Sequence, residues 1–153
     1  MEEKKEVQDR IIKTANVHKV SEEEFSNILK AVAPGTNLRA ALDGILKAKK
    51  GALIVIENEN IPQLIEGGFK INTKFPPQKL IELSKMDGAI VLSKDLKKIS
   101  YANVLVTTES NIKSSETGTR HKAAERAAKQ AGTLMIAISE RRQEISLFYK
   151  NLK

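Results

Sequence analysis

The sequence contains no cysteine and no tryptophan, and aromatic side chains make up only 4% of its 153 residues. The absence of cysteine excludes disulfides and cysteine-ligated metals and is compatible with the cytoplasmic location that we expect. No apolar run approaches the ~20 residues that cross a bilayer, and the charged start MEEKKEVQDR lacks the apolar centre of a secretory signal. We therefore expect no membrane association and a core built from aliphatic side chains.

Short apolar runs alternate with helical patterns along most of the chain. The runs at 51–58, 87–92, 101–106 and 133–139 predict strands that are apolar on both faces, which is typical of a sheet covered on both sides. Helices are expected at 21–33, 38–50, 76–86 and 119–131, a short strand at 67–72, and a hairpin strand at 144–149. The predicted fold class is α/β, with a mixed, mostly buried central β-sheet flanked by α-helices. Residues 1–20 predict a helical extension and residues 21–153 a single domain.

The net charge of +7 is concentrated near the end of the chain. Residues 120–153 hold eight basic and three acidic residues, so most of the excess lies in the last fifth of the sequence. This placement indicates either an anionic partner, such as a nucleotide or a nucleic acid, or a solvated basic face.

The stretch SSETGTRHKAAERAAKQAG, residues 114–132, places a cationic cluster at the start of an alanine-rich helix. Thr119 can cap this helix, and the free N–H groups of its first turn attract anions. Arg120 and Lys122 add positive charge, and His121 can donate to a phosphate or ligate a metal. The alternative is a capped helix start that faces solvent.

A second candidate site is the segment MDGA, residues 86–89. Asp87 stands just before a predicted buried strand, next to a glycine that would let a ligand approach the backbone. Its carboxylate could bind a metal or accept a proton from a hydroxyl. The alternative is an ordinary Asp-Gly turn.

Together these two segments resemble the diadenylate cyclase domain, most nearly the form found at the N-terminus of DNA integrity scanning proteins (DisA). The matching segments are KMDGAIVLSKDLKKISYANV and the final forty residues from SSETGTRHK onward, with APGTNLRAALDGILKAKKGALIVIEN and IEGGFKINTKF upstream. The resemblance implies that two ATP molecules on two facing protomers condense into cyclic di-3′,5′-AMP and two pyrophosphates, with Mg²⁺ or Mn²⁺. It therefore implies a face-to-face homodimer, and a higher oligomer remains open. The helical spine and DNA-binding domain of such proteins are absent from these 153 residues.

The resemblance also implies roles for particular residues. Asp87 would engage the 3′-hydroxyl or the metal, and Arg120, His121 and Lys122 would grip the phosphates. The remaining ATP-binding residues implied are Gly88, Ala89, Val106, Thr119, Ser139 and Arg142.

Two positions depart from the pattern that the resemblance implies. Lys122 stands where arginine is typical, and Ala123 stands where threonine is common. Lysine keeps the charge but loses the forked hydrogen bonding of arginine. Two alternatives to a cyclase therefore stay open: a catalytically weakened domain that binds ATP or cyclic di-AMP, and a nucleic-acid-binding module that uses the basic C-terminal third.

Overall fold

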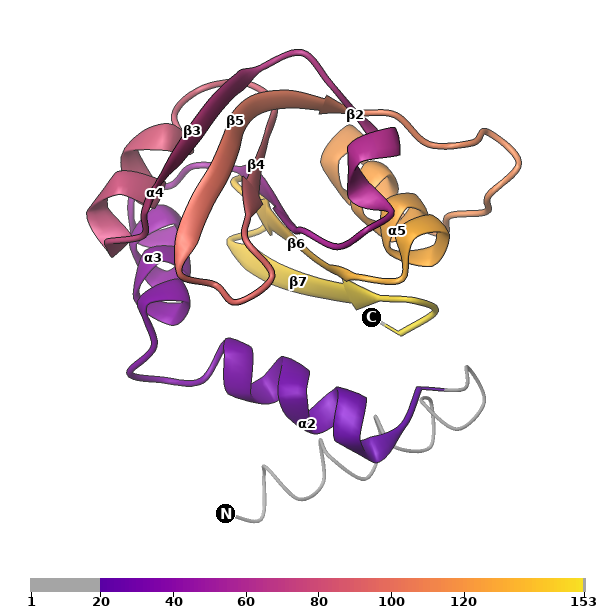
Figure 1. The fold of residues 1–153 in the computed structure, drawn as a ribbon, viewed down its shortest axis with the longest axis horizontal. Helices are drawn as coiled ribbons and strands as arrows, with labels where there is room; N and C mark the ends of the chain where they lie inside the picture. The colour runs from indigo at the N-terminus through magenta and orange to yellow at the C-terminus, as the bar shows by residue number, and fades with distance from the viewer. Residues whose placement is uncertain (1–19, 153) are drawn as a thin grey trace.

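The computed structural model describes residues 20–152, which form one sheet with helices around it (Figure 1). The helices are α2 (Glu22–Ala31), α3 (Asn37–Lys47), α4 (Pro77–Leu83) and α5 (Thr119–Ala131), with one short 3-10 turn, η1 (Ile61–Gln63). The strands are β1 (Ala52–Ile56), β2 (Ile65–Glu66), β3 (Phe69–Lys74), β4 (Ala89–Leu92), β5 (Lys98–Val106), β6 (Leu134–Ser139) and β7 (Glu144–Tyr149).

The strands form a mixed sheet in the order β2-β5-β4-β1-β6-β7, with β3 also paired to β5. β1 and β4 are parallel, and every other pairing is antiparallel. All residues of β1 and β4 are buried, as are all of β6 except Ser139. The expected mixed, mostly buried central sheet is thus confirmed.

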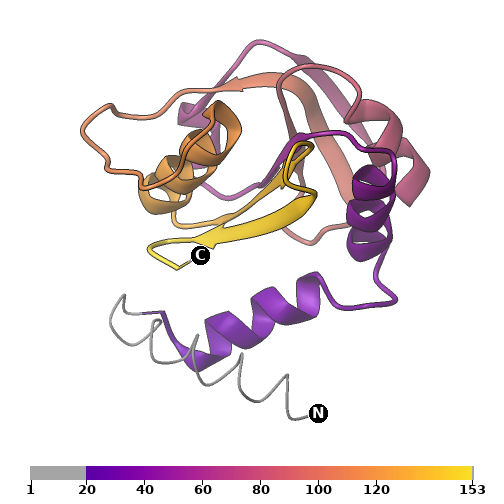
Figure 2. The same ribbon diagram turned by 180° about the vertical axis from the view of Figure 1, so that it is seen from behind.

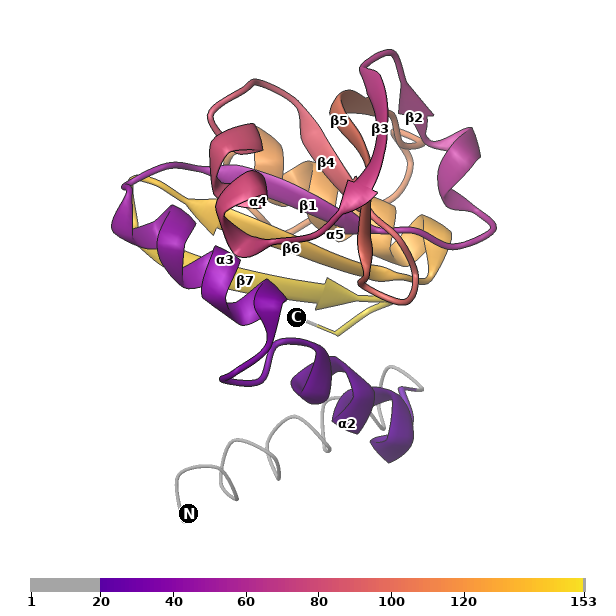
Figure 3. The ribbon, with the colours of Figure 1, turned by 60° about the vertical axis from the view of Figure 1, so that its left-hand side comes forward.

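Alternate residues of the central strands pack on opposite sides of the sheet. In β1, Ile54 and Ile56 join a cluster with α3 and α4, whereas Leu53 and Val55 join a cluster with α5. Figures 2 and 3 show the same division, with α3 and α4 on one face and α5 on the other. Among residues 20–152, no helix is long and apolar enough to span a membrane.

The alanines of α5 explain how this helix packs so close to the sheet. Ala124, Ala127 and Ala128 are fully buried against it, and Ala131 nearly so. Asn58 and Asn60, which follow β1, donate to the carbonyl of Ala131 and fix the C-terminal end of the helix. The start of α5 is therefore held at the opposite edge of the sheet, where β1 begins.

Some sequence predictions need correction. Thr119 is not the cap of α5: the cap is Gly118, with φ 91°, and Thr119 is the first helical residue. β5 begins three residues before the predicted strand, and α4 ends three residues before the predicted helix. η1 and β2 were not predicted. The predicted helical extension falls outside the described residues, except for Val20, so the boundary between residues 20 and 21 stays a prediction.

Candidate active site

A pocket of about 620 Å³ opens at the start of α5, where the β6–β7 turn meets the helix. Five of the predicted site residues line it: Thr119, Arg120, His121, Ser139 and Arg142. Within residues 20–152, no side-chain hydrogen bond caps the helix, and its first turn contains no acidic residue. The partial positive charge of the helix start therefore faces this pocket, which we call the phosphate pocket.

His121 is a buried wall of the phosphate pocket. Its side chain is 5% exposed and packs edge-on against Phe148 of β7, with ring centroids 6.3 Å apart. Burial lowers the pKa of His121, and the positive charges of Arg142 and Arg120 lower it further. The lowered pKa favours the neutral imidazole, although the carboxylates of Glu116 and Glu144 act in the opposite direction. Its Nε2 is buried and has no hydrogen-bond partner among residues 20–152, so it is available to a ligand in the pocket.

Ser139 and Arg142 are brought together by the tight turn after β6. The hydroxyl oxygen of Ser139 accepts a hydrogen bond of 3.0 Å from the backbone N–H of Arg142. The Arg142 side chain lies 3.6 Å from the carboxylate of Glu144, and both are substantially exposed. The turn thus places a hydroxyl and a guanidinium opposite the first turn of α5.

Arg120 lies across the start of β1, over Gly51. A Cβ atom added at Gly51 would lie 2.8 Å from Cζ of Arg120 and still closer to Nη1. Gly51 is buried, and its backbone does not adopt the left-handed conformation. The space above it, rather than backbone freedom, is what glycine provides at this position.

Asp87 stands before β4, at a corner built with β5. The side-chain amide of Asn103 donates to the carbonyl of Asp87 over 2.6 Å, and the Asp87 carboxylate is exposed. Gly88 has φ +86°, and a Cβ there would lie 2.9 Å from the Val104 carbonyl oxygen. Asn103 itself is left-handed, with φ 58°, at an irregularity in the β4–β5 pairing. The Asp-Gly pair is therefore a packed corner that needs glycine.

The start of β4 and the phosphate pocket lie at the same edge of the sheet. Ile54 of β1 pairs with Ile90 of β4 and with Ile136 of β6. Continuing both registers by three residues brings Asp87, Gly51 and Ser139 to one level. Adjacent strands are about 4.8 Å apart, so Asp87 and Ser139 are separated by about 10 Å with Gly51 between them.

The other predicted site residues lie outside the phosphate pocket. Ala89 is buried at the start of β4, and Val106 is half-buried at the end of β5, where it pairs with Ile65. Both residues lie near Asp87, where β4 begins and β5 ends. Lys122 is exposed and does not line the phosphate pocket, so the change from arginine to lysine alters none of its walls.

Sequence reasoning missed residues that organise this region. Glu125 is buried on α5 and accepts a 2.7 Å hydrogen bond from the backbone N–H of Ser115. Arg126 and Lys129 donate to the carbonyls of Ile112 and Lys113. These residues tie loop 107–118 along the helix. Gly51 was also missed, although a glycine directly before a buried strand is a signal that could have pointed to it.

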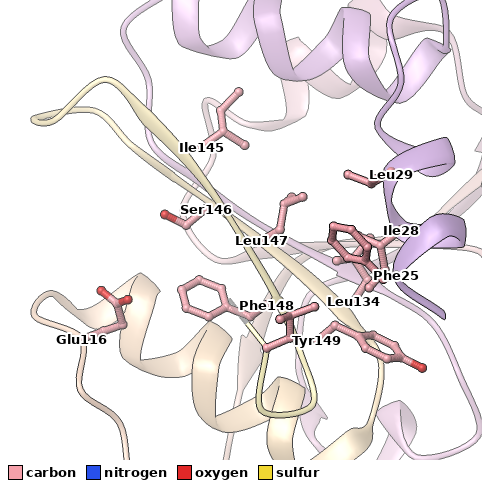
Figure 4. A pocket seen from close by; sticks show the side chains of 11 residues that line it. Phe25, Ile28, Leu29, Glu116, Leu134, Ile145, Ser146, Leu147, Phe148 and Tyr149 are labelled. Atoms are coloured by element: carbon pink, nitrogen blue, oxygen red, sulfur yellow. The ribbon is translucent and has the colours of Figure 1, made fainter. Parts of the chain in front are cut away.

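A second hollow of about 440 Å³ lies between α2 and β7 and has a different character (Figure 4). Its walls are mainly apolar and include Phe25, Leu29, Leu147 and Phe148, together with Glu116 and Ser146. Among residues 20–152, no lysine, arginine or histidine lines it. Cationic side chains of the described residues line the phosphate pocket and not this hollow, so the phosphate pocket is the candidate site for an anion.

The fold and this pocket define an α/β domain with a cationic pocket at the free start of a helix. Residues 39–152 match the family described as DisA bacterial checkpoint controller nucleotide-binding, the diadenylate cyclase (DAC) domain. The chain belongs to this family.

The relatives include DNA integrity scanning proteins DisA. The protein of Bacillus subtilis is 53% identical over 131 residues, which cover 85% of this chain and 36% of the relative. That of Clostridium kluyveri is 51% identical over 133 residues, covering 86% of this chain and 38% of the relative. The chain thus spans little more than a third of the length of these relatives.

Two of the solved structures that share this fold come from Bacillus cereus and Staphylococcus aureus. A hypothetical membrane spanning protein from Bacillus cereus matches with a TM-score of 0.71 at 22% identity, covering 99% of this chain and 92% of that chain. DacA from Staphylococcus aureus, a double mutant, matches with a TM-score of 0.61 at 25% identity, covering 74% of this chain and 81% of that chain. The first likeness concerns the fold alone.

Proposed function

We propose that this chain is a diadenylate cyclase that joins two ATP molecules into cyclic di-3′,5′-AMP and releases two pyrophosphates. The observation that carries the proposal is the phosphate pocket. It combines an uncapped helix start, three arginines (Arg120, Arg141 and Arg142) and a buried histidine whose Nε2 has no partner among residues 20–152. Membership of the diadenylate cyclase family supports the reaction type.

In this proposal the ATP lies along the edge of the sheet. Ser139 of β6 and Val106 of β5 lie at this edge with β1 and β4 between them. Three strand spacings separate the two residues, a distance of about 14 Å. The triphosphate occupies the phosphate pocket, with Thr119, Ser139 and the helix N–H groups as donors. The ribose lies near Asp87 and against the backbone of Gly88 and Ala89, and the adenine borders Val106.

The protein groups mainly position the reactants and neutralise charge. Arg120 and Arg142 balance the phosphate oxygens, and Lys122 adds positive charge beside them. The neutral His121 donates one hydrogen bond from Nε2 without adding charge. Asp87 either accepts the proton of the 3′-hydroxyl as a base or orients this hydroxyl for attack.

The residues present fit a divalent cation bound mainly by the substrate. Among residues 20–152 there is no group of three acidic or histidine side chains that could hold a metal alone. Mg²⁺ commonly binds through one or two carboxylates together with substrate phosphates, and Mn²⁺ suits the same oxygen ligands. Asp87 would supply that carboxylate. Such an ion would offset the negative charge of the phosphates when ATP is bound.

A homodimer is part of the proposal because each 3′-hydroxyl must reach the other ATP. Residues 20–152 contain four large exposed apolar side chains. Three of them, Phe69, Met86 and Leu105, lie within two residues of Gly68, Gly88 or Asn103. Gly68 and Gly88 both pack against Asn103. An apolar surface next to Asp87 supports docking of a second copy there, with the two ATP sites facing each other.

The alternatives gain less support from the described residues. A domain that had lost catalysis would be expected to have altered walls in the phosphate pocket. Lys122 is exposed and does not line that pocket, so the lysine leaves these walls unchanged. Three basic residues of the C-terminal third are engaged within the domain: Arg126 and Lys129 with loop 107–118, and Lys150 with Glu24. They are therefore less available to a nucleic acid.

One experiment tests the proposed function directly. The protein is incubated with ATP and Mn²⁺ or Mg²⁺, and cyclic di-AMP is sought by mass spectrometry, with ATP binding measured in parallel. We expect product from the unchanged chain and none from Arg120→Ala, which also loses ATP affinity. ATP binding without product would favour the weakened binding domain, and DNA binding without ATP binding would favour the nucleic-acid module.

A further inference from the structure

We propose that a second cavity beside the phosphate pocket is a separate anion subsite, which takes the pyrophosphate that the reaction releases. The identity of the ligand rests on the proposed function. The cavity measures about 560 Å³ and is lined by Lys49, Arg120, Glu140, Arg141 and Gln143. We call it the pyrophosphate subsite.

The pyrophosphate subsite and the phosphate pocket are neighbours with a common wall. Arg120, Glu140 and Arg141 line both, whereas Lys49 and Gln143 line only the subsite. Lys49 comes from the loop before β1, and the turn of residues 140–143 lies beside that loop in all three views (Figures 1–3). A phosphate chain can therefore pass from one cavity to the other across Arg120.

The charges of the subsite are suited to an anion with several negative charges. Its walls carry three cationic side chains and one carboxylate, Glu140. Among residues 20–152, Lys49, Arg120 and Arg141 form no ion pair within 4.0 Å, whereas Arg142 pairs with Glu144. Three unpaired cations around one cavity repel each other, and a bound anion relieves that repulsion.

The proposed chemistry creates such an anion at this place. The 3′-hydroxyl oxygen of one ATP bonds to the α-phosphorus of the other, and its proton passes to a base. The bond from that phosphorus to the oxygen that bridges to the β-phosphorus breaks. The electron pair stays on the bridging oxygen, so the departing pyrophosphate gains negative charge. Lys49 and Arg141 then stabilise the pyrophosphate as it leaves the phosphate pocket, which holds the triphosphate before the reaction.

The test uses inorganic pyrophosphate itself, titrated calorimetrically into the full chain at low ionic strength without divalent metal. Lys49→Asn removes the charge and still tolerates the left-handed backbone at this position, where φ is 57°. Arg141→Gln removes the second charge. Lys94→Gln is the matched control, because Lys94 is exposed after β4, at the opposite edge of the sheet.

We expect each subsite variant to weaken pyrophosphate binding about five-fold and the double variant about twenty-fold, as for partly exposed charged contacts. The control should stay within about two-fold. Glu140→Gln removes the one carboxylate that residues 20–152 contribute to the subsite and should tighten binding. Higher salt should weaken binding to the unchanged chain, since exposed charges are screened.

The outcomes separate this inference from the proposed function. If the unchanged chain forms cyclic di-AMP and the double variant binds pyrophosphate as tightly as Lys94→Gln, the subsite is refuted and the proposed function stands. If no cyclic di-AMP forms but Lys49→Asn, whose side chain lines the subsite and not the phosphate pocket, weakens pyrophosphate binding as expected, the subsite stands and the proposed reaction fails. Unchanged binding in Glu140→Gln would also count against the subsite, independently of any effect of the double variant on folding.

Discussion

The substitution Gly51→Ala should disable the site while leaving the fold intact. The new Cβ would lie 2.8 Å from Cζ of Arg120, whereas ordinary van der Waals contact begins at 3.4 Å. The guanidinium must therefore retreat by more than half an ångström, and Nη1 by more than Cζ. A misplacement of about 1 Å can cost 10²-fold in rate, so we expect kcat/KM for cyclic di-AMP formation to fall about ten- to hundred-fold.

The same substitution should affect stability little. The group that it displaces is the far end of an exposed, flexible side chain, and the Gly51 backbone is not left-handed. Alanine at such a position restricts the unfolded chain, which adds about 0.4–1 kcal/mol to the free energy of unfolding. Urea denaturation should therefore show a free energy of unfolding within about 1 kcal/mol of the unchanged protein.

The assay compares four proteins by ATP affinity and by cyclic di-AMP formation: the unchanged chain, Gly51→Ala, Arg120→Ala and the double variant. Once Arg120 is alanine, no guanidinium remains for the new Cβ to displace, so Gly51→Ala should add no further loss of ATP affinity. Gly44→Ala is the matched control, because its Cβ would crowd Ile81 between α3 and α4, and neither residue lines the phosphate pocket. Full activity in Gly51→Ala, or an equal loss of affinity with and without Arg120, would refute this reasoning.

Four further predictions follow from other parts of the domain. Asp87→Asn should lower cyclic di-AMP formation about 100-fold or more while ATP affinity changes only a few-fold; an equal fall in both would contradict a role at the 3′-hydroxyl. Because burial lowers the pKa of His121 from 6.5, the unfolded state binds more protons near pH 6, so the free energy of unfolding should fall as pH drops below 6.5. Urea titrations at pH 5.5 and 7.5 should show this slope, and its persistence in His121→Gln would assign it to other groups. Glu125→Ala should cost about 1–3 kcal/mol in the free energy of unfolding, because the backbone N–H of Ser115 loses its acceptor. Glu125→Gln, which keeps an acceptor oxygen, should cost less. Leu105→Lys should shift the protein toward monomer in analytical ultracentrifugation and lower product formation, whereas Leu29→Lys, another exposed apolar position, should leave the dimer unchanged.

Local sequence patterns predicted most helices and strands because their determinants are local. The Ser21 hydroxyl accepts from the backbone N–H of Glu24, as the capping pattern SEEE predicts. The helix at 119–131 was predicted with its observed bounds, since Gly118 and Gly132 flank an alanine-rich stretch. The prediction that Thr119 caps this helix was wrong. Gly118 has a positive φ of 91° and is the cap, so Thr119 is already the first helical residue.

The sequence also identified the charged residues of the candidate site but not their surroundings. His121 reads as one more polar residue at a helix start, yet Phe148 from a distant strand packs against it and helps to bury it. That burial lowers the pKa of His121 and leaves its Nε2 without a partner in the described part of the chain. No local pattern reports a contact between α5 and the last strand.

The sequence by itself determined the α/β class, the aliphatic core, the position of the cationic helix start and, through its resemblance, the family. These depend on periodicity, capping and residue type, which act within a few neighbouring residues. Only the tertiary structure decided that Gly51, Asp87 and Ser139 share one edge, that Arg120 lies over Gly51, and that Lys49 faces the turn after β6. The physical reason is that strand order and register join residues far apart in the chain, and no single segment encodes which partner it will meet.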